Sequence, residues 1–372
     1  MKIKPFGVEI WMNEHENDCK YNLAETCCAS ISVRQLLELT GESERHLQAL
    51  LDLRMTYGDI TGSPAIKEAI CALYSGQKPE NITITHGGIG ANALSLYTLV
   101  ERGDRVVSVL PTYQQHYSIP EAIGADVQIL RLRPENRWLP DLDELRNLAT
   151  PGTKLICINN PNNPTGALMD ETMLREIVEI ARGCGAWLLC DEVYRGVIHR
   201  DGDCTLSVAD LYERGISTAS LSKPYSLAGL RVGWVAGPPE FIEQVNGYRD
   251  YHIISVGMVD DYLGTLALRH RDRLLHRNVA LARHNADLLA QWMQAQPLLS
   301  YIPPAAGTTA FVKFEPDMPS AQFCQRLQDE TGVFFVPGSA FDVEGHFRIG
   351  FANETPILEE GLAVFSNWLK QF

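Results

Sequence analysis

The chain has 372 residues, 45% of them hydrophobic and 21% charged, which is the composition of a globular protein of about two domains with a large buried core. Its 32 lysines and arginines against 46 aspartates and glutamates leave a net charge of −14, which opposes broad attraction to nucleic acid or an anionic membrane. No apolar stretch approaches the ~20 residues that cross a bilayer. Because the negative charge opposes nucleic acid and membrane surfaces, the composition favours a small-molecule partner.

The nine cysteines form no CxxC pair and no Cys/His spacing typical of a metal site, so we expect no metal. The chain begins Met1-Lys2-Ile3-Lys4-Pro5-Phe6 with no apolar run after it, and we expect a reduced, cytoplasmic protein without a signal peptide. The adjacent Cys27 and Cys28 are interpreted as small, semi-buried side chains, and a redox or nucleophilic role is the alternative.

Short apolar runs rich in β-branched residues alternate with helical patterns through the middle of the chain. Helix candidates lie at 91–102 and 171–183, and the apolar runs lie at 82–85, 106–110, 127–130, 155–158, 187–190, 217–221 and 232–235. This alternation predicts an α/β fold whose large domain, residues 46–260, has a mostly parallel seven-stranded sheet with helices on both faces.

The C-terminal part changes character at a long helical stretch, 269–296. Strand patterns follow around 309–312, 334–336 and 346–351, and a closing helix is expected over 357–368. We expect a smaller α+β domain over 261–372, which the N-terminal segment, residues 1–45, joins.

Polar motifs follow five of the predicted strands. Since ligands of such sheets bind at the carboxyl ends of the strands, these motifs are expected to meet at one rim. They are His86-Gly87-Gly88, Pro111-Thr112-Tyr113, Asn159-Asn160-Pro161, Asp191 and Lys223.

Lys223 ends the run Ser220-Leu221-Ser222-Lys223, and Arg231 follows eight residues later. A lysine near a fixed positive charge and away from water is expected to have a lowered pKa, which frees its amine to form a Schiff base with an aldehyde. The arginine fork and the serine hydroxyl suit a phosphate. The alternative is a surface lysine beside a turn.

Asp191 follows an apolar strand, where it either caps the next turn or supplies the anion that keeps a pyridine nitrogen protonated. Tyr194, three residues later, would reach a ring hydroxyl. The turn Asn160 to Gly166 contains two asparagine-proline steps, which would fix Asn163 as an oriented hydrogen-bond donor.

The glycine-rich run from His86 to Asn92 opens a helix, so its N–H groups can face a phosphate. It matches neither the Walker nor the dinucleotide pattern, which favours a single phosphate ester. Tyr113 either stacks on a flat ring or packs in the core with its hydroxyl bonded. Tyr57 lies in a glycine-containing loop, where exposure is the simplest expectation.

Together these residues resemble the class I/II aminotransferases of the fold-type I, pyridoxal-phosphate-dependent superfamily, from about residue 20 to the end. The resemblance rests on motifs that occur together: Lys223 with Ser220 and Arg231, Asp191 with Tyr194, the Asn160 to Gly166 turn, the Tyr57 to Gly62 run, and Arg348. It implies pyridoxal 5′-phosphate as the cofactor, an amino acid and a 2-oxo acid as substrates, and a homodimer whose site lies at the subunit boundary.

The resemblance also implies roles for single residues. Lys223 would bind the cofactor aldehyde and carry the proton, and Arg348 would pair with the substrate α-carboxylate. The other implied roles are Asp191 at the pyridine nitrogen, Asn163 and Tyr194 at the ring hydroxyl, Tyr113 on the ring face, Gly88, Ile89, Ser220 and Arg231 at the phosphate, and Tyr57 reaching the phosphate from the other subunit.

The chain departs from the family pattern at three places. Ile89 stands where serine or threonine is common, Pro224 follows the lysine directly, and Tyr21 to Thr26 lacks the glycine-containing substrate loop. The first two leave cofactor binding in place. The third puts the substrate in doubt, and Glu25 nearby would either receive a cationic side chain or lie solvated.

Amino-group transfer from an α-amino acid to a 2-oxo acid is the predicted reaction. Elimination or cyclisation on a polar or basic amino acid is the alternative, because Ser220 to Trp234 and Arg249-Asp250-Tyr251 also resemble the capreomycidine synthases, which cyclise a hydroxyarginine. A ligand-binding homologue without catalysis is the non-enzyme alternative; a silent homologue would be expected to have lost Lys223 or Asp191, and both are present.

Overall fold

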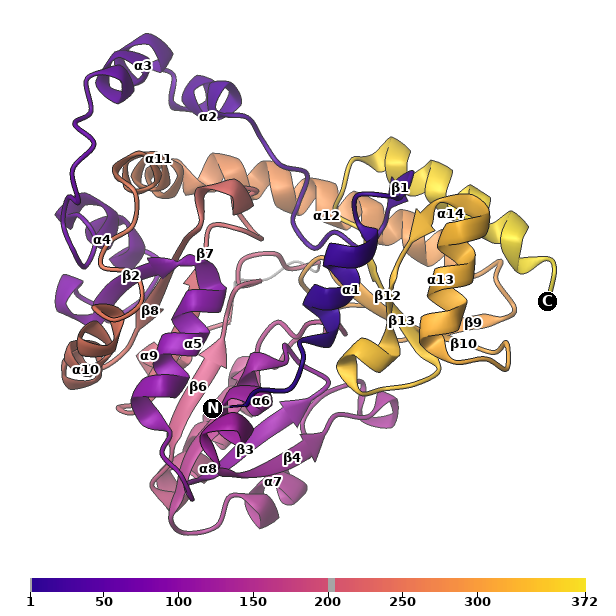
Figure 1. Ribbon diagram of the computed structural model, residues 1–372, viewed down its shortest axis with the longest axis horizontal. Coiled ribbons are helices and arrows are strands. Elements are labelled where there is room, and N and C mark those ends of the chain that lie inside the picture. Colours follow the sequence, from indigo (N-terminus) through magenta and orange to yellow (C-terminus); the bar gives the residue numbers. More distant parts are fainter. Residues whose placement is uncertain (1, 200–204) are drawn as a thin grey trace.

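A seven-stranded sheet dominates the computed structural model, which describes residues 2–199 and 205–372 (Figure 1). The strand order is β2-β8-β7-β6-β5-β3-β4, and each of the seven predicted runs forms one of these strands. Their bounds are β2 Ile82–His86, β3 Arg105–Leu110, β4 Asp126–Arg131, β5 Thr153–Asn159, β6 Trp187–Asp191, β7 Gly215–Ser220 and β8 Val232–Ala236. The strands from β7 to β4 are parallel and β8 is antiparallel to both neighbours, which confirms the predicted, mostly parallel sheet.

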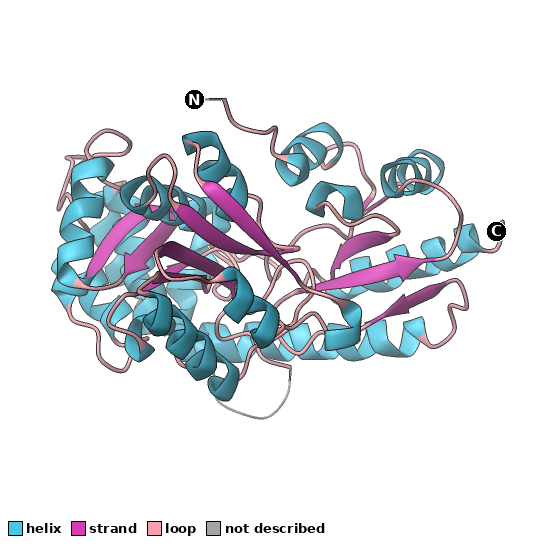
Figure 2. Ribbon diagram, turned by 90° about the horizontal axis from the view of Figure 1, so that it is seen from below, coloured by secondary structure: helices cyan, strands magenta, loops and turns pink. Residues whose placement is uncertain are grey.

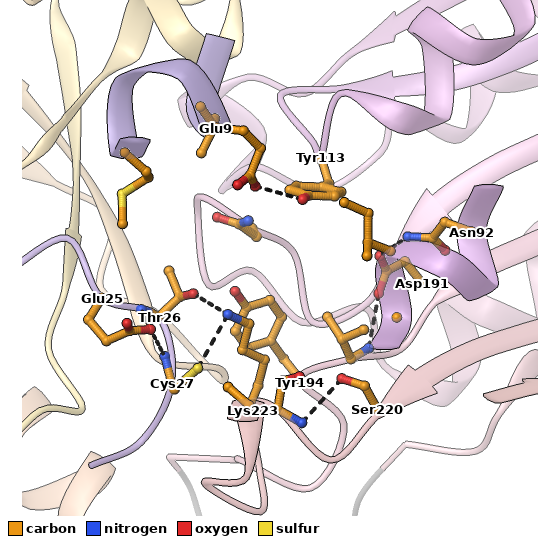
Figure 3. A pocket seen from close by; sticks show the side chains of 18 of the residues that line it. Glu9, Glu25, Thr26, Cys27, Asn92, Tyr113, Asp191, Tyr194, Ser220 and Lys223 are labelled. Atoms are coloured by element: carbon orange, nitrogen blue, oxygen red, sulfur yellow. Dashed lines mark hydrogen bonds between the residues drawn. The ribbon is translucent and has the colours of Figure 1, made fainter. Parts of the chain in front are cut away.

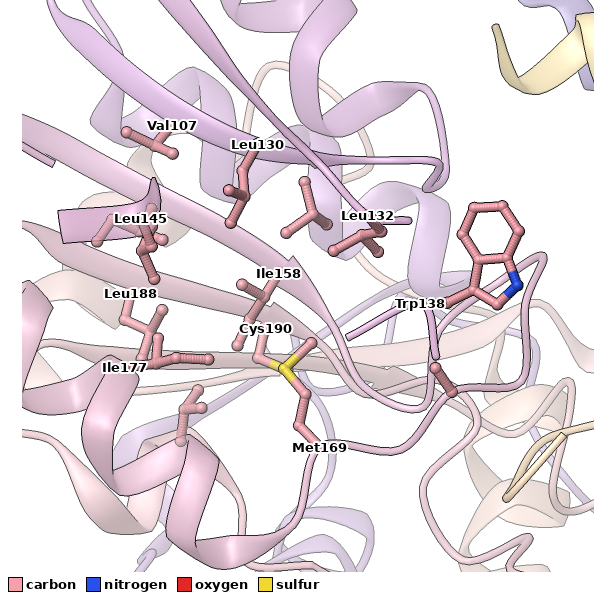
Figure 4. Close-up of a cluster of buried hydrophobic side chains, with 14 of the residues drawn as sticks. Val107, Leu130, Leu132, Trp138, Leu145, Ile158, Met169, Ile177, Leu188 and Cys190 are labelled. Atoms are coloured by element: carbon pink, nitrogen blue, oxygen red, sulfur yellow. The ribbon is translucent and has the colours of Figure 1, made fainter. Parts of the chain in front are cut away.

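Helices cover both faces of this sheet (Figure 2). Alternate residues of each strand pack against different helices, because successive side chains of a strand point to opposite faces. On one face Leu155 and Cys157 of β5 pack with α5 and α10. On the other, Ile156 and Ile158 pack with α8 and with Leu188 and Cys190 of β6 (Figure 4). The helices of this part of the chain are α4 Pro64–Cys71, α5 Gly87–Leu99, α6 Gln115–Ile123, α7 Leu142–Leu148, α8 Glu171–Cys184, α9 Val208–Leu211, α10 Pro239–Arg249 and α11 Met258–Arg269.

The C-terminal part forms a smaller antiparallel sheet of order β12-β13-β10-β9, whose core is rich in stacked phenylalanines. Its strands are β9 Leu299–Tyr301, β10 Thr309–Phe314, β12 Val336–Pro337 and β13 His346–Gly350. Its helices are α12 Arg271–Met293, α13 Ser320–Thr331 and α14 Thr355–Leu369. The smaller α+β unit expected from the sequence is therefore present.

The N-terminal segment contacts both parts of the molecule. Strand β1, Tyr21–Asn22, pairs with β11, Val333–Phe334, and Trp11 of α1, Gly7–His15, donates to the carbonyl of Phe335. Leu36 and Leu37 of α2, Val33–Thr40, instead join a core cluster of the large sheet's helices, and α3, Ser43–Leu51, follows. The domain bounds expected from the sequence stay a prediction.

The predicted rim exists because β2, β3, β5, β6 and β7 all run the same way. Asn159 pairs in register with Asp191, and Asp191 with Thr218, so the ends of β5 and β6 lie level beside β7. Helix α5 begins at Gly87, four residues earlier than its apolar pattern indicated, because the glycines form its first turn. The early start brings the helix N-terminus to the same rim.

Candidate active site

A cavity of about 330 Å³ opens at this rim, between the large sheet, α1 and the C-terminal part (Figure 3). It brings together all of the predicted site residues except Tyr57. They are Gly88, Ile89, Tyr113, Asn163, Asp191, Tyr194, Ser220, Lys223, Arg231 and Arg348. Residues from strand ends far apart in sequence therefore meet in one space, as the parallel topology predicts.

The amine of Lys223 points into this cavity from the loop after β7. Its Nζ donates to Thr26 Oγ1 at 2.5 Å and to Cys27 Sγ at 3.5 Å. Both partners belong to the N-terminal segment, and both are buried. The lysine is thus held by side chains that no motif in the sequence indicated.

The expected lowering of the Lys223 pKa is wrong. Burial alone would lower this pKa, but Cys27, Tyr194 and the Glu25 carboxylate outweigh burial and raise it above its usual value. The sequence suggested a neighbouring positive charge, whereas the fold brings Glu25 close, and an anion favours the charged ammonium. Lys223 must therefore give up a proton before its amine can attack a carbonyl.

Asp191 is buried at the end of β6 and is held on both oxygens. Oδ2 accepts from Asn92 Nδ2 at 2.7 Å, and Oδ1 accepts from the Val193 N–H at 3.0 Å. Asn92 is oriented in turn, because its Oδ1 accepts from the Thr218 hydroxyl at 2.6 Å. His116 Nε2 lies 3.8 Å from Asp191 Oδ2, and burial lowers the pKa of this histidine. An anchored carboxylate in a dry site suits a protonated ring nitrogen.

The turn from Asn160 to Gly166 fixes Asn163 through its neighbours. The Asn163 N–H donates to Asn159 Oδ1 at 2.7 Å, while Asn162 Nδ2 donates to the carbonyl of Pro111 at 3.1 Å. Asn163 Oδ1 accepts from Arg348 Nη1 at 3.2 Å. The amide of Asn163 is therefore oriented on the cavity wall next to Arg348.

Arg348, on β13, is 3% exposed and brings a guanidinium from the C-terminal part into the cavity. Its Nη2 donates to the carbonyl of Ala24 at 3.1 Å, and its Nε has no hydrogen-bond partner among the described residues. An unpaired donor at a buried position is costly. Arg348 is thus prepared for an anion such as a carboxylate.

The first turn of α5 forms a tight cradle beside Arg231. Gly87 has a φ of +69°, and its N–H donates to the carbonyl of Arg231 at 2.8 Å. A Cβ on Gly88 would lie 2.7 Å from Val193 Cγ1, so a side chain there would not fit. The free N–H groups of a helix start, the Ser220 hydroxyl and a guanidinium suit a phosphate.

Tyr113 contacts α1 rather than packing as an ordinary core tyrosine. Its hydroxyl donates to Glu9 Oε1 at 2.7 Å, and burial and the Glu9 carboxylate raise its pKa well above the usual value. Tyr194 is also buried, and burial raises its pKa although Lys223 and Arg348 oppose the shift. Both tyrosines are therefore neutral hydrogen-bonding groups on the cavity wall.

Tyr57 is the predicted site residue that this cavity does not include. Its side chain is 70% exposed, and it lines a neighbouring hollow with Thr56, His86 and Arg231. Since Arg231 borders both spaces, Tyr57 lies just beyond the phosphate cradle. Its role across a subunit boundary stays a prediction.

Sequence reasoning missed several residues of the cavity. Asn92 carried a signal, because it ends the glycine-rich run and lies one helical turn after Gly88. For the α1 residues, the only signal in the sequence was a helical repeat of apolar and acidic positions, which does not indicate a place in the site. The lining residues without a predicted role include Val8, Glu9, Met12, Glu16, Thr26, Asn92 and Asn159.

These groups fit pyridoxal phosphate on four counts. The cavity offers a lysine amine, an anchored carboxylate, a phosphate cradle and a tyrosine ring beside them. The fold and the site thus define a fold-type I, pyridoxal-phosphate-dependent enzyme.

Comparisons with known proteins give the family. Residues 30–362 match the family described as aminotransferase class I and II. A solved PLP-dependent aminotransferase from Streptococcus suis 89-1591 is 46% identical, with a TM-score of 0.97 over 100% of this chain and 99% of that one. The capreomycidine synthase of Streptomyces vinaceus is 31% identical over 97% of this chain and 93% of its own. The solved PLP-dependent cyclase OrfR is 28% identical, with a TM-score of 0.92 over 100% of this chain and 98% of that one.

The chain therefore belongs to the aminotransferase class I and II family, and its cofactor is pyridoxal phosphate. Its relatives include both an aminotransferase and a cyclase, so the family alone does not fix the reaction. Among the described residues, no helix combines the length and apolar character that crossing a membrane requires. The expected cytoplasmic location stays a prediction.

Proposed function

We propose that this enzyme transfers the amino group of an α-amino acid to a 2-oxo acid. The observation that carries the proposal is that the Lys223 amine, the Asp191 carboxylate and the Arg348 guanidinium line one cavity. Pyridoxal phosphate, when bound, withdraws electrons from the bonds at the substrate Cα. Transamination asks little more of the protein than a proton carrier and an anchor for the substrate.

In this proposal the cavity residues hold the cofactor by complementary chemistry. Asp191 pairs with the pyridine nitrogen, and Asn163 and Tyr194 bond the ring hydroxyl. The Tyr113 ring stacks on the cofactor ring. The groups for the phosphate are the N–H groups of Gly88 and Ile89, the Ser220 hydroxyl and Arg231. Ile89 needs no hydroxyl for this role, because its backbone lies in the first turn of α5.

Lys223 Nζ would remove the proton from the substrate Cα and deliver it to the carbon of the cofactor that had been its aldehyde, before water releases the 2-oxo acid. The Thr26 hydroxyl, at 2.5 Å, holds the amine while it carries this proton. Arg348 binds the α-carboxylate through its unpaired Nε and turns the Cα–H bond toward Lys223. Asn163, which bonds Arg348, keeps the guanidinium in position.

We also propose a homodimer in which Tyr57 reaches the partner's phosphate cradle. The exposed apolar side chains of Met55 and Tyr57 and of Tyr251 and Ile254 support this assembly, because large apolar groups in water favour a covered surface. The hollow between Tyr57 and Arg231 leaves room for such an approach.

A second candidate is cyclisation or elimination on a polar or basic amino acid. The likeness to capreomycidine synthase and to OrfR supports it, since each aligns with nearly the whole chain. The same Lys223 and Arg348 would serve, and only the bond broken after loss of the Cα proton would differ.

Product identification separates the two candidates. Holoenzyme is incubated with each amino acid, with and without pyruvate or 2-oxoglutarate, and products are identified by mass spectrometry. Transfer requires the acceptor and yields a 2-oxo acid from the donor; products formed equally well without an acceptor contradict transfer and favour the second candidate. Lys223→Ala is the control, and turnover that survives it would refute the assignment of the base.

A further inference from the structure

Helix α1 presents one face to the active-site cavity. Val8, Met12 and Glu16 line the cavity at successive helical turns, on one side of the helix and its C-cap, and Glu9, next to Val8, lines it as well. Asn13 also borders the cavity, whereas Glu14 is exposed and does not line it. This face combines two apolar side chains with two carboxylates, an arrangement that the catalytic roles above leave unused.

A third carboxylate, Glu25, faces the same region from the segment after β1 (Figure 3). Its Oε1 accepts from the N–H groups of Thr26 at 2.7 Å and Cys27 at 2.8 Å, so this side chain is fixed. Burial raises the pKa of Glu16, and the Glu25 and Glu9 carboxylates raise it further. Glu16 therefore lies close enough to the other two carboxylates to be repelled by both.

Within residues 2–199 and 205–372, no lysine, arginine or histidine forms an ion pair with Glu16. Glu9 bonds Tyr113 and Glu25 lies near Lys223, but the Glu16 carboxylate makes no hydrogen bond or ion pair with any residue that the structure describes. It is half-buried on the cavity wall, where water can compensate it only in part. A ligand with a positive charge would compensate the charge of the Glu16 carboxylate.

Arg348 supplies the opposite charge in the same cavity, where its Nη2 donates to the carbonyl of Ala24, the residue before Glu25. Arg348 carries a buried, unpartnered Nε that points to an anion, which the α-carboxylate of an amino acid supplies. The described lining contains two further cations, Lys223 and Arg231, which the proposed function assigns to the aldehyde and the phosphate. No lining cation is left over for a carboxylate on the substrate side chain.

We infer that the substrate is an α-amino acid with a cationic side chain, a guanidinium or an ammonium, whose head is bound by Glu16. The aliphatic stem lies along Val8 and Met12, because long cationic side chains pair an apolar stem with a charged head. The inference rests on the proposed function, since it places the amino acid at Arg348 and Lys223. Helix α1 is then the element that selects the substrate.

The test compares L-arginine with L-citrulline, which has the same length and no charge. Dissociation constants for the holoenzyme are measured by calorimetry without a 2-oxo acid, and the cofactor spectrum is followed in parallel. We expect arginine to bind at least about tenfold more tightly than citrulline, as a charge-assisted contact gives. Equal affinities for the two ligands would overturn the inference.

Glu16→Gln keeps the shape of the side chain and removes its charge. It is expected to weaken arginine binding about tenfold and leave citrulline binding unchanged, while Glu16→Asp restores part of the difference. Glu14→Gln is the matched control, because Glu14 is an exposed carboxylate on the same helix. A Glu16→Gln effect that is equal for both ligands would mean a structural role and would contradict the inference.

The result also separates the inference from the proposed function. If neutral amino acids such as norleucine react and arginine does not, the substrate class is wrong and amino transfer stands. If no amino acid of the panel changes the cofactor spectrum or yields a product, the proposed function fails, and the inference that rests on it fails too.

Discussion

Replacement of Asp191 by asparagine tests the central assignment of the site. The change removes the negative charge and keeps the shape of the side chain. Asp191 accepts from Asn92 on one oxygen and from the Val193 N–H on the other, so an amide can serve only one of these donors. Asn92 cannot simply turn over, because its own oxygen accepts from the Thr218 hydroxyl.

Two effects of different size follow. One buried donor loses its acceptor, which is expected to lower the free energy of unfolding by about 1–3 kcal/mol. With the cofactor bound, the ring nitrogen loses its buried anion, and breaking such a pair costs about 3–5 kcal/mol. At 1.36 kcal/mol per factor of ten, the rate of Cα deprotonation is expected to fall by about 10² to 10⁴.

The rate is measured in single turnovers of the holoenzyme with an amino donor, and stability by urea unfolding. Asn92→Ala is the graded comparison, because it removes one bond and keeps the charge, and a loss of about tenfold is expected. Asp317→Asn, an exposed carboxylate, is the charge-matched control. An Asp191→Asn enzyme with the wild-type single-turnover rate would refute the pairing of Asp191 with the ring nitrogen.

Further substitutions test the anchor, the cradle and the subunit boundary. Arg348→Lys is expected to raise KM for the amino donor about 10- to 100-fold with a smaller change in kcat, since a compact ammonium lacks the planar fork that bonds Ala24 and Asn163 and also pairs with a carboxylate. An unchanged KM in steady-state kinetics would contradict this prediction. Gly88→Ala is expected to lower the free energy of unfolding in urea by about 1–3 kcal/mol, because the new Cβ would lie 2.7 Å from Val193 Cγ1. Gly183→Ala, on the open face of α8, is the control without such a contact. Tyr57→Phe is expected to weaken cofactor binding about tenfold in equilibrium dialysis with the dimer intact in sedimentation, and an unchanged affinity would show that Tyr57 does not reach a phosphate.

The sheet and its rim could be predicted because they depend on local patterns. Seven apolar runs of strand length alternate with helical patterns, and parallel pairing then brings their carboxyl ends together without further information. The positions of Asp191, Asn163 and Lys223 follow from this, since Asp191 stands directly after an apolar run and the other two lie in the turns that follow theirs. Arg348 was named only through the resemblance to a family, because nothing local in its strand indicates that it reaches the other part of the molecule.

Local sequence patterns could not predict which side chains of the N-terminal segment contact Lys223 in the cavity. Thr26 and Cys27 lie almost two hundred residues from Lys223, yet their side chains receive its hydrogen bonds. The expected lowering of the Lys223 pKa was wrong for this reason: burial lowers this pKa, but Cys27, Tyr194 and Glu25 lie near the amine and together raise it. An amine's charge state depends on the sum of its neighbours, and only the fold decides which neighbours are present.

The residues proposed for the chemistry and those inferred to select the substrate lie on different elements of the fold. The end of β6 carries Asp191 and the loop after β7 carries Lys223, and both candidate reactions would use these two residues. Helix α1 is tied to the C-terminal part through Trp11 and to the cavity through Glu9, and in the inferred binding mode it carries the groups that distinguish one amino acid from another. A change of substrate would then require substitutions on this one short helix. In the proposed function Arg348 and Asn163 set the orientation of the bonds at Cα, so a change of reaction would require a change at these residues instead.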